Sequence, residues 1–499
     1  MLISLDRKSK QPLYRQIIDG VRRLADGEAL REGQPLPSSR RLAAQLGVDR
    51  TTVTEAYAEL QAMGYLRSRP GSYTVVQRRG GREAGLRGGP CPVEWGRRAR
   101  PEAEAALRAF RAPAAERAST KGLRPDLISL AQLDPDPRLF PLARIQRTFS
   151  RSLWSHAHEP FEYGSHQGFR PLRDHLARRM RLHGMAVTAD EILVTNGAQQ
   201  ALDLVIRSLA GPGRRVVVEA PTYALMIPLL RMNGTAPVPV PLRDDGIDLD
   251  RLEKVLDKEP VAFVYTMPNF QNPTGITTGH EHRARLLALC RSRGVPIVED
   301  GFEEDMKYYG KVDLPIKSMD GGNVVIYVGT FSKALFPGLR VGWVAADAEC
   351  VQRLTAIKRY ADLTSNHLAQ VFLYDFCEAG HYDSHLRRLH RAYRRRLALT
   401  LKTLKETFPP SVTWTEPPGG YTLWVRMPRR LSGEELDELL GPHGVAVSAG
   451  QNYFCGASAS EFFRLCIART DESEITEGVR RLGRALSAEF GRPSGTAGR

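Results

Sequence analysis

The stretch TFSKALFPGLRVG, residues 330–342, carries the strongest chemical signal in this 499-residue chain. The apolar run before it reads as a buried strand. A lysine at the end of such a strand has a lowered pKa, because burial and neighbouring cations disfavour its ammonium form. Thr330, Ser332 and Arg340 add two hydroxyls and a fixed cation, which suit a phosphate group. The pattern therefore predicts that Lys333 is a Schiff-base-forming amine rather than a solvated loop lysine.

Apolar runs alternate with amphipathic stretches from about residue 123 onward. Five of these runs read as strands: Glu191–Thr195, Arg215–Glu219, Ala262–Thr266, Pro296–Asp300 and Val324–Gly329. Strands separated by helical patterns imply βαβ units, so we expect an α/β fold with a mainly parallel central sheet. The carboxyl ends of parallel strands meet at one edge of the sheet, where open α/β folds bind ligands.

Four further motifs lie at or just after these runs. TNGAQQ (residues 195–200) opens a predicted helix, and the backbone N–H groups of Ala198 and Gln199 at its start favour a phosphate. PTY (221–223) supplies the ring of Tyr223, and NFQNPTG (269–275) supplies the amide of Asn272 on a turn fixed by Pro and Gly. Asp300 ends the fourth run. Taken alone, Tyr223 could be structural and Asp300 a helix cap, but their order and spacing favour one site.

The first 76 residues have a different pattern. Apolar residues at helical spacing predict a helix over about residues 11–25, and Ser38 or Ser39 can cap a second helix over 40–46 that ends at Gly47. Asp49 is a suitable N-cap for a third helix over 50–63, and residues 65–76 read as a hairpin. Two helices joined by a tight turn containing Gly form a helix-turn-helix, followed here by a wing.

The outward residues of this segment suit a nucleic acid. The candidate DNA contacts are Ser38, Ser39 and Arg40 at the start of the second helix, Arg50, Thr51, Thr52 and Thr54 at the start of the third, and Arg67 and Arg69 on the wing. Residues 1–124 hold 24 Lys and Arg against 13 Asp and Glu, a balance of +11 in a chain of net charge +15. This asymmetry indicates a polyanionic partner, whereas the alternative is a three-helix bundle with a solvated Arg and Thr face.

The rest of the sequence argues against several classes of protein. No apolar run is long enough to cross a bilayer, and the N-terminus lacks the pattern of a signal peptide, so we expect a cytoplasmic protein. The six cysteines form no C-x-x-C pair and the histidines show no ligand spacing, so neither a disulfide framework nor a metal site is expected. We expect a DNA-binding domain over 1–76, a Gly-, Pro- and Arg-rich linker over 77–122 with a short helix around 102–110, a large domain over 123–488 and a tail over 489–499.

Residues 11–76 closely resemble the GntR-type winged helix. The matching motifs are LYxQI (13–17), LPSSRxLA (36–43), LGV (46–48), YxxL (57–60) and GY (64–65). The resemblance implies a double-stranded DNA operator as the partner. The wing tip departs from the family, because GSYTV (71–75) lacks the usual second glycine.

Residues 125–488 resemble the fold-type I aminotransferases on the motifs above, and the whole chain resembles the MocR/GabR-type regulators. The resemblance implies a pyridoxal 5'-phosphate cofactor, a smaller C-terminal α/β subdomain and a homodimer. In this family Lys333 would form the Schiff base, Asp300 would pair with the ring nitrogen, Asn272 would bond the phenolate oxygen and Tyr223 would stack on the ring. Ala198, Gln199, Thr330, Ser332 and Arg340 would hold the phosphate, Tyr163 would reach the phosphate of the partner subunit, and Arg464 would bind a substrate carboxylate.

One position in the large domain departs from the family pattern. The family usually has a tyrosine two residues after the aspartate, but Phe302 stands there in this chain. The cofactor phenolate would then lose a donor worth roughly 1.5–3 kcal/mol. We expect the pKa of the Schiff base to be higher than with a tyrosine.

Two functions follow from these features. The first is a transcription regulator that senses an amino compound, or the cofactor itself, through Lys333. The second is a working aminotransferase that carries a DNA-binding module, in which Lys333 moves the proton. A fold-type I lyase or decarboxylase is a third reading. A well-patterned winged helix favours the regulator, because it has no purpose in a simple metabolic enzyme.

Overall fold

The computed structural model describes residues 3–491 except 8, 10, 28, 69–72, 78–94, 112–125, 157, 311–312 and 322. The chain forms two compact units, Met1–Arg98 and Ala99–Arg499. The division falls within the segment predicted to be a linker, whose described residues form two helices, α4 (Trp95–Arg98) and α5 (Pro101–Arg111). The second of these agrees with the short helix expected there.

The N-terminal unit is a winged helix-turn-helix. It consists of α1 (Leu13–Asp26), α2 (Ser39–Leu46), α3 (Arg50–Ala62) and the antiparallel pair β1 (Leu66–Arg67) and β2 (Val75–Val76). Ser38 caps α2 by accepting from the Arg41 N–H, and Asp49 caps α3 by accepting from the Thr51 N–H. Gly47 ends α2 with a φ of 63°, a conformation that favours glycine. The predicted helices and caps are therefore confirmed.

The second unit is built on an eight-stranded sheet of order β4-β11-β10-β9-β8-β5-β6-β7. The strands are β4 (Ile192–Thr195), β5 (Arg215–Ala220), β6 (Ala236–Arg243), β7 (Gly246–Ile247), β8 (Val261–Thr266), β9 (Ile297–Asp300), β10 (Val325–Thr330) and β11 (Gly342–Ala345). Neighbours from β10 to β6 are parallel, whereas β11 runs antiparallel to both β10 and β4, and β7 antiparallel to β6. The expected α/β fold with a mainly parallel sheet is confirmed.

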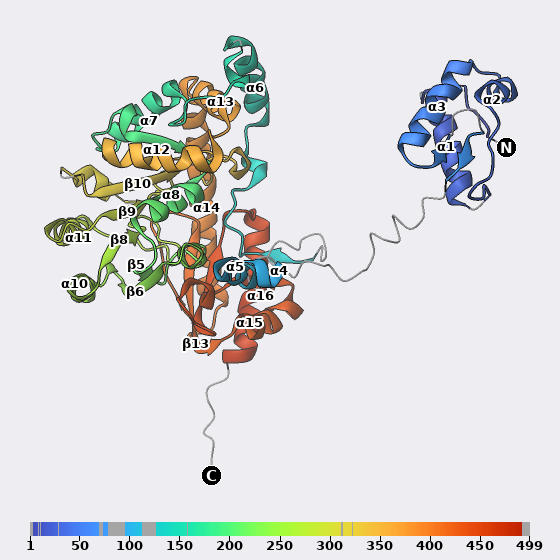
Figure 1. Cartoon of the computed structure of the whole chain (residues 1–499). Coiled ribbons are helices and arrows are strands. Elements are labelled where there is room, and N and C mark those ends of the chain that lie inside the picture. Colours follow the sequence, from blue (N-terminus) through green and yellow to red (C-terminus); the bar gives the residue numbers. More distant parts are fainter. Residues whose placement is uncertain are drawn as a thin grey trace. The chain divides into compact units, whose positions relative to one another are not determined.

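Helices cover both faces of this sheet. They are α7 (Arg170–Leu182), α8 (Ala198–Leu209), α9 (Met226–Met232), α10 (Leu249–Lys258), α11 (His280–Ser292), α12 (Ala348–Asp362), α13 (His367–Glu378) and α14 (His381–Thr407), and α6 (Leu142–Ser155) packs on α13. Alternate strand residues face opposite ways: Val216 and Val218 belong to the apolar cluster that includes residues of α8 and α12, whereas Val217 belongs to the cluster that includes residues of α10 and α11. In Figure 1, α10 and α11 accordingly lie on the other side of the sheet from α8. Strands buried on both faces explain the continuous apolar runs of the sequence.

A smaller subdomain follows at the C-terminus, as expected. Its four-stranded antiparallel sheet has the order β12-β13-β16-β15, formed by β12 (Thr413–Trp414), β13 (Thr422–Leu431), β15 (Ser448–Ala449) and β16 (Ser460–Cys466). Its helices are α15 (Gly433–Leu440) and α16 (Glu472–Phe490), and β14 (Val445–Ala446) pairs in parallel with β3 (Ile128–Ser129). Short 3-10 turns occupy 137–139, 159–161, 189–191, 316–319, 337–339, 441–443 and 450–453. Among the described residues, no helix is both long and apolar enough to span a membrane.

Candidate functional site

Most of the predicted site residues of the large unit meet at the carboxyl edge of the sheet. A cavity of about 310 Å³ opens there. Its lining includes nine of the predicted residues, namely Ala198, Gln199, Tyr223, Asn272, Asp300, Thr330, Ser332, Lys333 and Arg340, and also Leu133, Leu202, Leu225, Met267 and Phe302. Because β4, β5, β8, β9 and β10 all point the same way, residues far apart in the sequence reach one edge.

Lys333 follows the end of β10 and projects into this cavity. Its Nζ donates to the Leu133 carbonyl oxygen at 2.9 Å and lies 4.0 Å from a carboxylate oxygen of Asp134. Burial lowers the pKa of Lys333, although Asp134 opposes the shift. A lowered pKa increases the neutral fraction of the amine at pH 7, which is the nucleophilic form.

Asp300, the last residue of β9, has the chemistry to pair with a protonated ring nitrogen. Its side chain is almost completely buried, and its Oδ2 accepts from the Tyr265 hydroxyl at 2.8 Å. The other oxygen, Oδ1, is buried without a hydrogen-bond partner among the residues described. Burial raises the pKa of Asp300 to about 6. A buried carboxylate oxygen without a donor is costly unless a ligand supplies one, so this residue fits the cofactor.

An anion-binding cradle lies at the start of α8. Gly197 precedes the helix with a φ of 82°, and a Cβ there would stand 2.5 Å from the Arg340 guanidinium, which donates to the Asn196 carbonyl at 2.9 Å. Across the cradle, the Thr330 hydroxyl donates to the Ser332 hydroxyl at 3.0 Å. The free N–H groups of the helix end and a guanidinium together suit a phosphate.

Arg464 brings the small subdomain to the same edge. It lies on β16 and is almost completely buried, and it donates from Nη1 to the Asn272 Oδ1 at 2.9 Å and from Nη2 to the Ala131 carbonyl at 2.6 Å. Its guanidinium carbon lies 5.3 Å from the centre of the Tyr453 ring. The Asn272 oxygen is therefore engaged, which leaves its amide nitrogen as the group that can donate to a ligand.

Phe302 lines the cavity at the position where the resemblance leads us to expect a tyrosine. The nearby tyrosine hydroxyls have other acceptors: Tyr265 donates to Asp300, Tyr223 to Gln199 at 3.2 Å, and Tyr421 to the Lys333 carbonyl at 2.7 Å. Within the part of the chain that the structure describes, no tyrosine replaces the missing donor. Tyr163 does not reach the cavity of its own chain, and its side chain is 85% exposed.

The candidate DNA contacts lie on the surface of the N-terminal unit. Ser38, Arg40, Arg50, Thr51, Thr54 and Arg67 are exposed, and Ser39 and Thr52 are half-buried. The Thr51 hydroxyl donates to Asp49 at 2.6 Å, and the Thr54 hydroxyl to the Arg50 carbonyl at 2.9 Å. Arg69 lies outside the described residues. No group of three or more metal-binding side chains occurs among the residues that are described.

The chain resembles known proteins in both its sequence and its fold. The family described as aminotransferase class I and II matches residues 134–482. The chain belongs to the class I and II aminotransferases. A second family, the bacterial regulatory proteins of the GntR family, matches residues 13–76. This class I and II aminotransferase therefore carries a GntR-type domain in front, which is the two-part organisation of the MocR-type regulators, as the sequence predicts.

Relatives of two kinds resemble this MocR-type chain. The 2-aminoadipate transaminase of Thermus thermophilus is 37% identical over 73% of this chain and 91% of its own length. Two regulators match nearly end to end. The HTH-type transcriptional regulator YdcR of Escherichia coli is 31% identical over 95% of this chain and 98% of its own length. The probable rhizopine catabolism regulatory protein MocR of Rhizobium meliloti is 28% identical over 98% and 96%.

A solved structure supports the cofactor of the MocR-type chain. The α-aminoadipate aminotransferase LysN of Thermus thermophilus, complexed with N-(5'-phosphopyridoxyl)-L-leucine, has a TM-score of 0.73 and 33% identity over 80% of this chain and all of its own. Class I and II aminotransferases depend on pyridoxal phosphate, so the predicted cofactor is confirmed at the level of the family.

The structure adds three contributors that sequence reasoning missed. Tyr265 hydrogen-bonds Asp300, and the carbonyls of Ala131 and Leu133 accept from Arg464 and Lys333. Tyr265 stands within an apolar run, where a buried tyrosine that needs a partner for its hydroxyl is a usable signal. The two carbonyls are backbone atoms, so no residue type could have indicated them.

Proposed function

We propose that this MocR-type chain is a pyridoxal-phosphate-dependent transcription regulator. In this proposal the N-terminal unit binds an operator, and the cavity around Lys333 senses a small amino compound or the cofactor itself. The observation that carries the proposal is that one chain holds both a capped helix of a winged helix-turn-helix, α3, and a cavity that gathers Lys333 and Asp300, with Arg464 bonded to the Asn272 of its lining.

The cavity residues divide into groups that would hold different parts of the cofactor. Lys333 would bind it covalently, Asp300 would hold a proton on the ring nitrogen, Asn272 would donate to the phenolate, and Tyr223 would face the ring. Ala198, Gln199, Thr330, Ser332 and Arg340 would hold the phosphate. When bound, the cofactor supplies an electron sink for a substrate amine.

The effector would bind through its amine and a carboxylate. Arg464 is held end-on by Asn272 and Ala131 and can still donate to a bidentate anion with its remaining N–H groups. The amine would arrive beside Lys333, whose lowered pKa keeps part of its population neutral and able to accept a proton. An α-amino acid, or a similar amine that bears a carboxylate, is the ligand class that fits.

The N-terminal unit would contact DNA with three of its parts. The exposed start of α3, with Arg50, Thr51, Thr52 and Thr54, would enter the major groove. The N–H groups at the start of α2, beside Ser38, Ser39 and Arg40, would meet a phosphate, and Arg67 would approach the backbone from the wing. A DNA partner implies that the protein works in the cytoplasm.

We also propose a homodimer. The exposed Tyr163 has no role in its own chain's cavity, so it would reach the phosphate site of a second copy. A twofold dimer would present two recognition helices, and the operator would carry two half-sites.

A working aminotransferase is the second candidate, because relatives such as the 2-aminoadipate transaminase are 37% identical and Lys333 is placed to move a proton. An absorbance titration of the cofactor-loaded protein with a panel of amino acids separates the two. A band that shifts with one amino acid and then persists supports a sensor. A band that disappears and returns over many cycles when a 2-oxo acid is added identifies an aminotransferase.

A further inference from the structure

A short segment of the large unit touches both ligand-binding cations of the site. We call this segment, residues 130–136, the strap. Its first residue is fixed to the small subdomain, because the Leu130 N–H donates to the Ala446 carbonyl at 2.8 Å and its carbonyl accepts from the Cys466 N–H at 2.7 Å. From there the Ala131 carbonyl accepts from Arg464 and the Leu133 carbonyl from Lys333. The strap therefore holds the two side chains that a carboxylate-bearing amine would engage.

Asp136 anchors the other end of the strap. Its side chain is completely buried, with Oδ2 accepting from Arg396 Nη2 at 2.7 Å and Oδ1 from Arg138 Nε at 2.8 Å. Its N–H donates to the Tyr393 hydroxyl at 3.2 Å. Burial would raise the pKa of Asp136, but the hydrogen bonds from Arg138 and Arg396 outweigh it and lower the pKa. Asp136 is therefore an ionised carboxylate held by two guanidinium groups.

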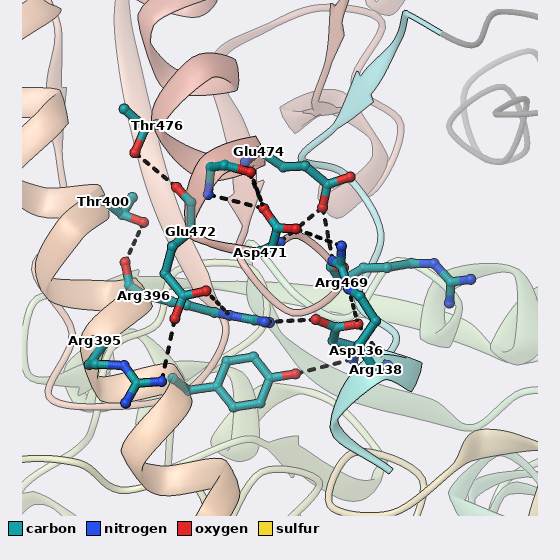
Figure 2. Close-up of polar contacts among 12 residues, drawn as sticks. Asp136, Arg138, Arg395, Arg396, Thr400, Arg469, Asp471, Glu472, Glu474 and Thr476 are labelled. Atoms are coloured by element: carbon teal, nitrogen blue, oxygen red, sulfur yellow. Dashed lines mark hydrogen bonds and ion pairs between the residues drawn. The ribbon is translucent and has the colours of Figure 1, made fainter.

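These two arginines connect Asp136 to α16 of the small subdomain and to α14, whose second half packs against that subdomain. Arg138 also donates to Asp471 at 2.7 Å and to Glu474 at 2.9 Å, both at the start of α16 (Figure 2). Arg396 lies on α14 and is 3.9 Å from Glu472. Figure 2 shows Asp136 facing the Arg396 guanidinium within this network. Arg464 belongs to the same subdomain. Asp136 therefore fixes the position of the strap relative to Arg464, whose guanidinium the Ala131 carbonyl orients.

We propose that Asp136 is a positioning residue for ligand binding, which acts by holding the strap carbonyls against Arg464 and Lys333. The inference rests on the proposed function, since it assumes that Arg464 binds a carboxylate. With the far end released, the Ala131 carbonyl no longer fixes one side of the guanidinium, and Arg464 must be ordered when the ligand arrives. Ordering this side chain at the moment of binding costs free energy and so weakens the affinity for the ligand.

The test is carboxylate binding by the full chain loaded with pyridoxal phosphate. Isocaproate, a carboxylate without an amine, is titrated while the absorbance band of the bound cofactor is followed. For Asp136→Asn we expect a dissociation constant about tenfold above that of the wild type, which is the effect of roughly one charge-assisted hydrogen bond.

Asp320→Asn is the matched control. The side chain of Asp320 is also completely buried and pairs with Lys317 at 3.2 Å, but it accepts from the N–H of Val325 at the amino end of β10, the edge opposite the cavity. Both substitutions should lower the melting temperature, but only Asp136→Asn should weaken the binding of isocaproate. If Asp136→Asn does not fold, Arg138→Gln tests the same contact. It removes one of the two guanidinium groups that bind the Asp136 carboxylate, and Arg138 is half-exposed.

Hydrogen exchange gives a readout that a loss of stability alone would not produce. The amides of the strap should exchange faster in Asp136→Asn than in Asp320→Asn at equal global stability. Two results overturn the inference and leave the proposed function standing. One is a dissociation constant for isocaproate in Asp136→Asn within twofold of the wild type, and the other is an equal loss of isocaproate affinity in Asp320→Asn. A wild-type protein that binds the cofactor but not isocaproate overturns the carboxylate part of the proposed function, and the inference with it.

Discussion

Replacing Asp300 by Asn should have opposite effects on the protein with and without its cofactor. Without the cofactor, the carboxylate is buried, and Oδ1 has no partner among the described residues. With the cofactor, the same oxygen would accept from the ring nitrogen. Asp300→Asn removes the charge and keeps the volume, so it isolates the electrostatic cost of the site.

The magnitude follows from the pKa of about 6, raised by burial from an ordinary value of 3.8. An acid whose pKa is higher in the folded state destabilises folding once the pH passes the unfolded value, and the cost levels off above the folded value. With about 1.4 kcal/mol per pKa unit, the cost reaches about 3 kcal/mol at pH 8 and is below about 1 kcal/mol at pH 4. The stability of the variant relative to the wild type should therefore rise by about 2–3 kcal/mol between these pH values.

Urea unfolding of both proteins without cofactor, at pH 4, 6 and 8, measures this difference, because all other titrating groups are shared. Asp300→Asn should also bind pyridoxal phosphate at least tenfold more weakly than the wild type does, since a hydrogen bond between charged groups is worth about 1.5–3 kcal/mol. A stability difference that is flat with pH, or that falls as pH rises, would refute the reasoning about Asp300.

Three further substitutions test other parts of the site. Phe302→Tyr should lower the pKa of the linkage between Lys333 and the cofactor by about 1–2 units in a spectroscopic pH titration, because it restores a donor worth roughly 1.5–3 kcal/mol; no change, or a rise, contradicts this account. Arg464→Gln should raise the dissociation constant for isocaproate at least tenfold while the cofactor band is retained, and an unchanged constant would show that the carboxylate binds elsewhere. Arg50→Ala should weaken operator binding, measured by fluorescence anisotropy, by about 1–3 kcal/mol if Arg50 contacts a base. If Arg50 contacts a phosphate instead, the variant should show a smaller salt dependence of binding. An unaltered affinity would show that Arg50 does not contact DNA.

Much of this architecture could be predicted because its signals are local. The Asp49 cap, the Gly47 turn and the apolar runs each depend on a few neighbouring residues. Parallel strands then bring Asn272 and Asp300 to one edge without any further information. We did not predict β11 or its antiparallel pairing with β10. Eleven residues join these two strands, which is too short for the usual helical crossover between parallel strands, so the antiparallel direction follows once β11 is placed.

The contacts that were missed depend on packing between distant segments. The Ala131 carbonyl meets Arg464 across more than 300 residues of sequence, and Asp136 meets Arg396 across 260. Nothing near either residue indicates these pairings. Tyr265 and Asp300 are closer in sequence, but their bond depends on two adjacent strands having a particular register, with Tyr265 opposite Val298.

In the proposed regulator, occupancy of the Lys333 site changes the affinity of the chain for DNA. The most direct test is fluorescence anisotropy of the full-length protein, loaded with pyridoxal phosphate, on the DNA upstream of its own gene, with and without the amino acid that shifts its absorbance. We expect a change in affinity of at least fivefold in the wild type, a usual size for coupling between sites, and none in Lys333→Ala, which should still bind DNA. Equal affinities with and without the amino acid, in a protein that turns over amino and oxo acids, would show that the chain is an enzyme and not a sensor.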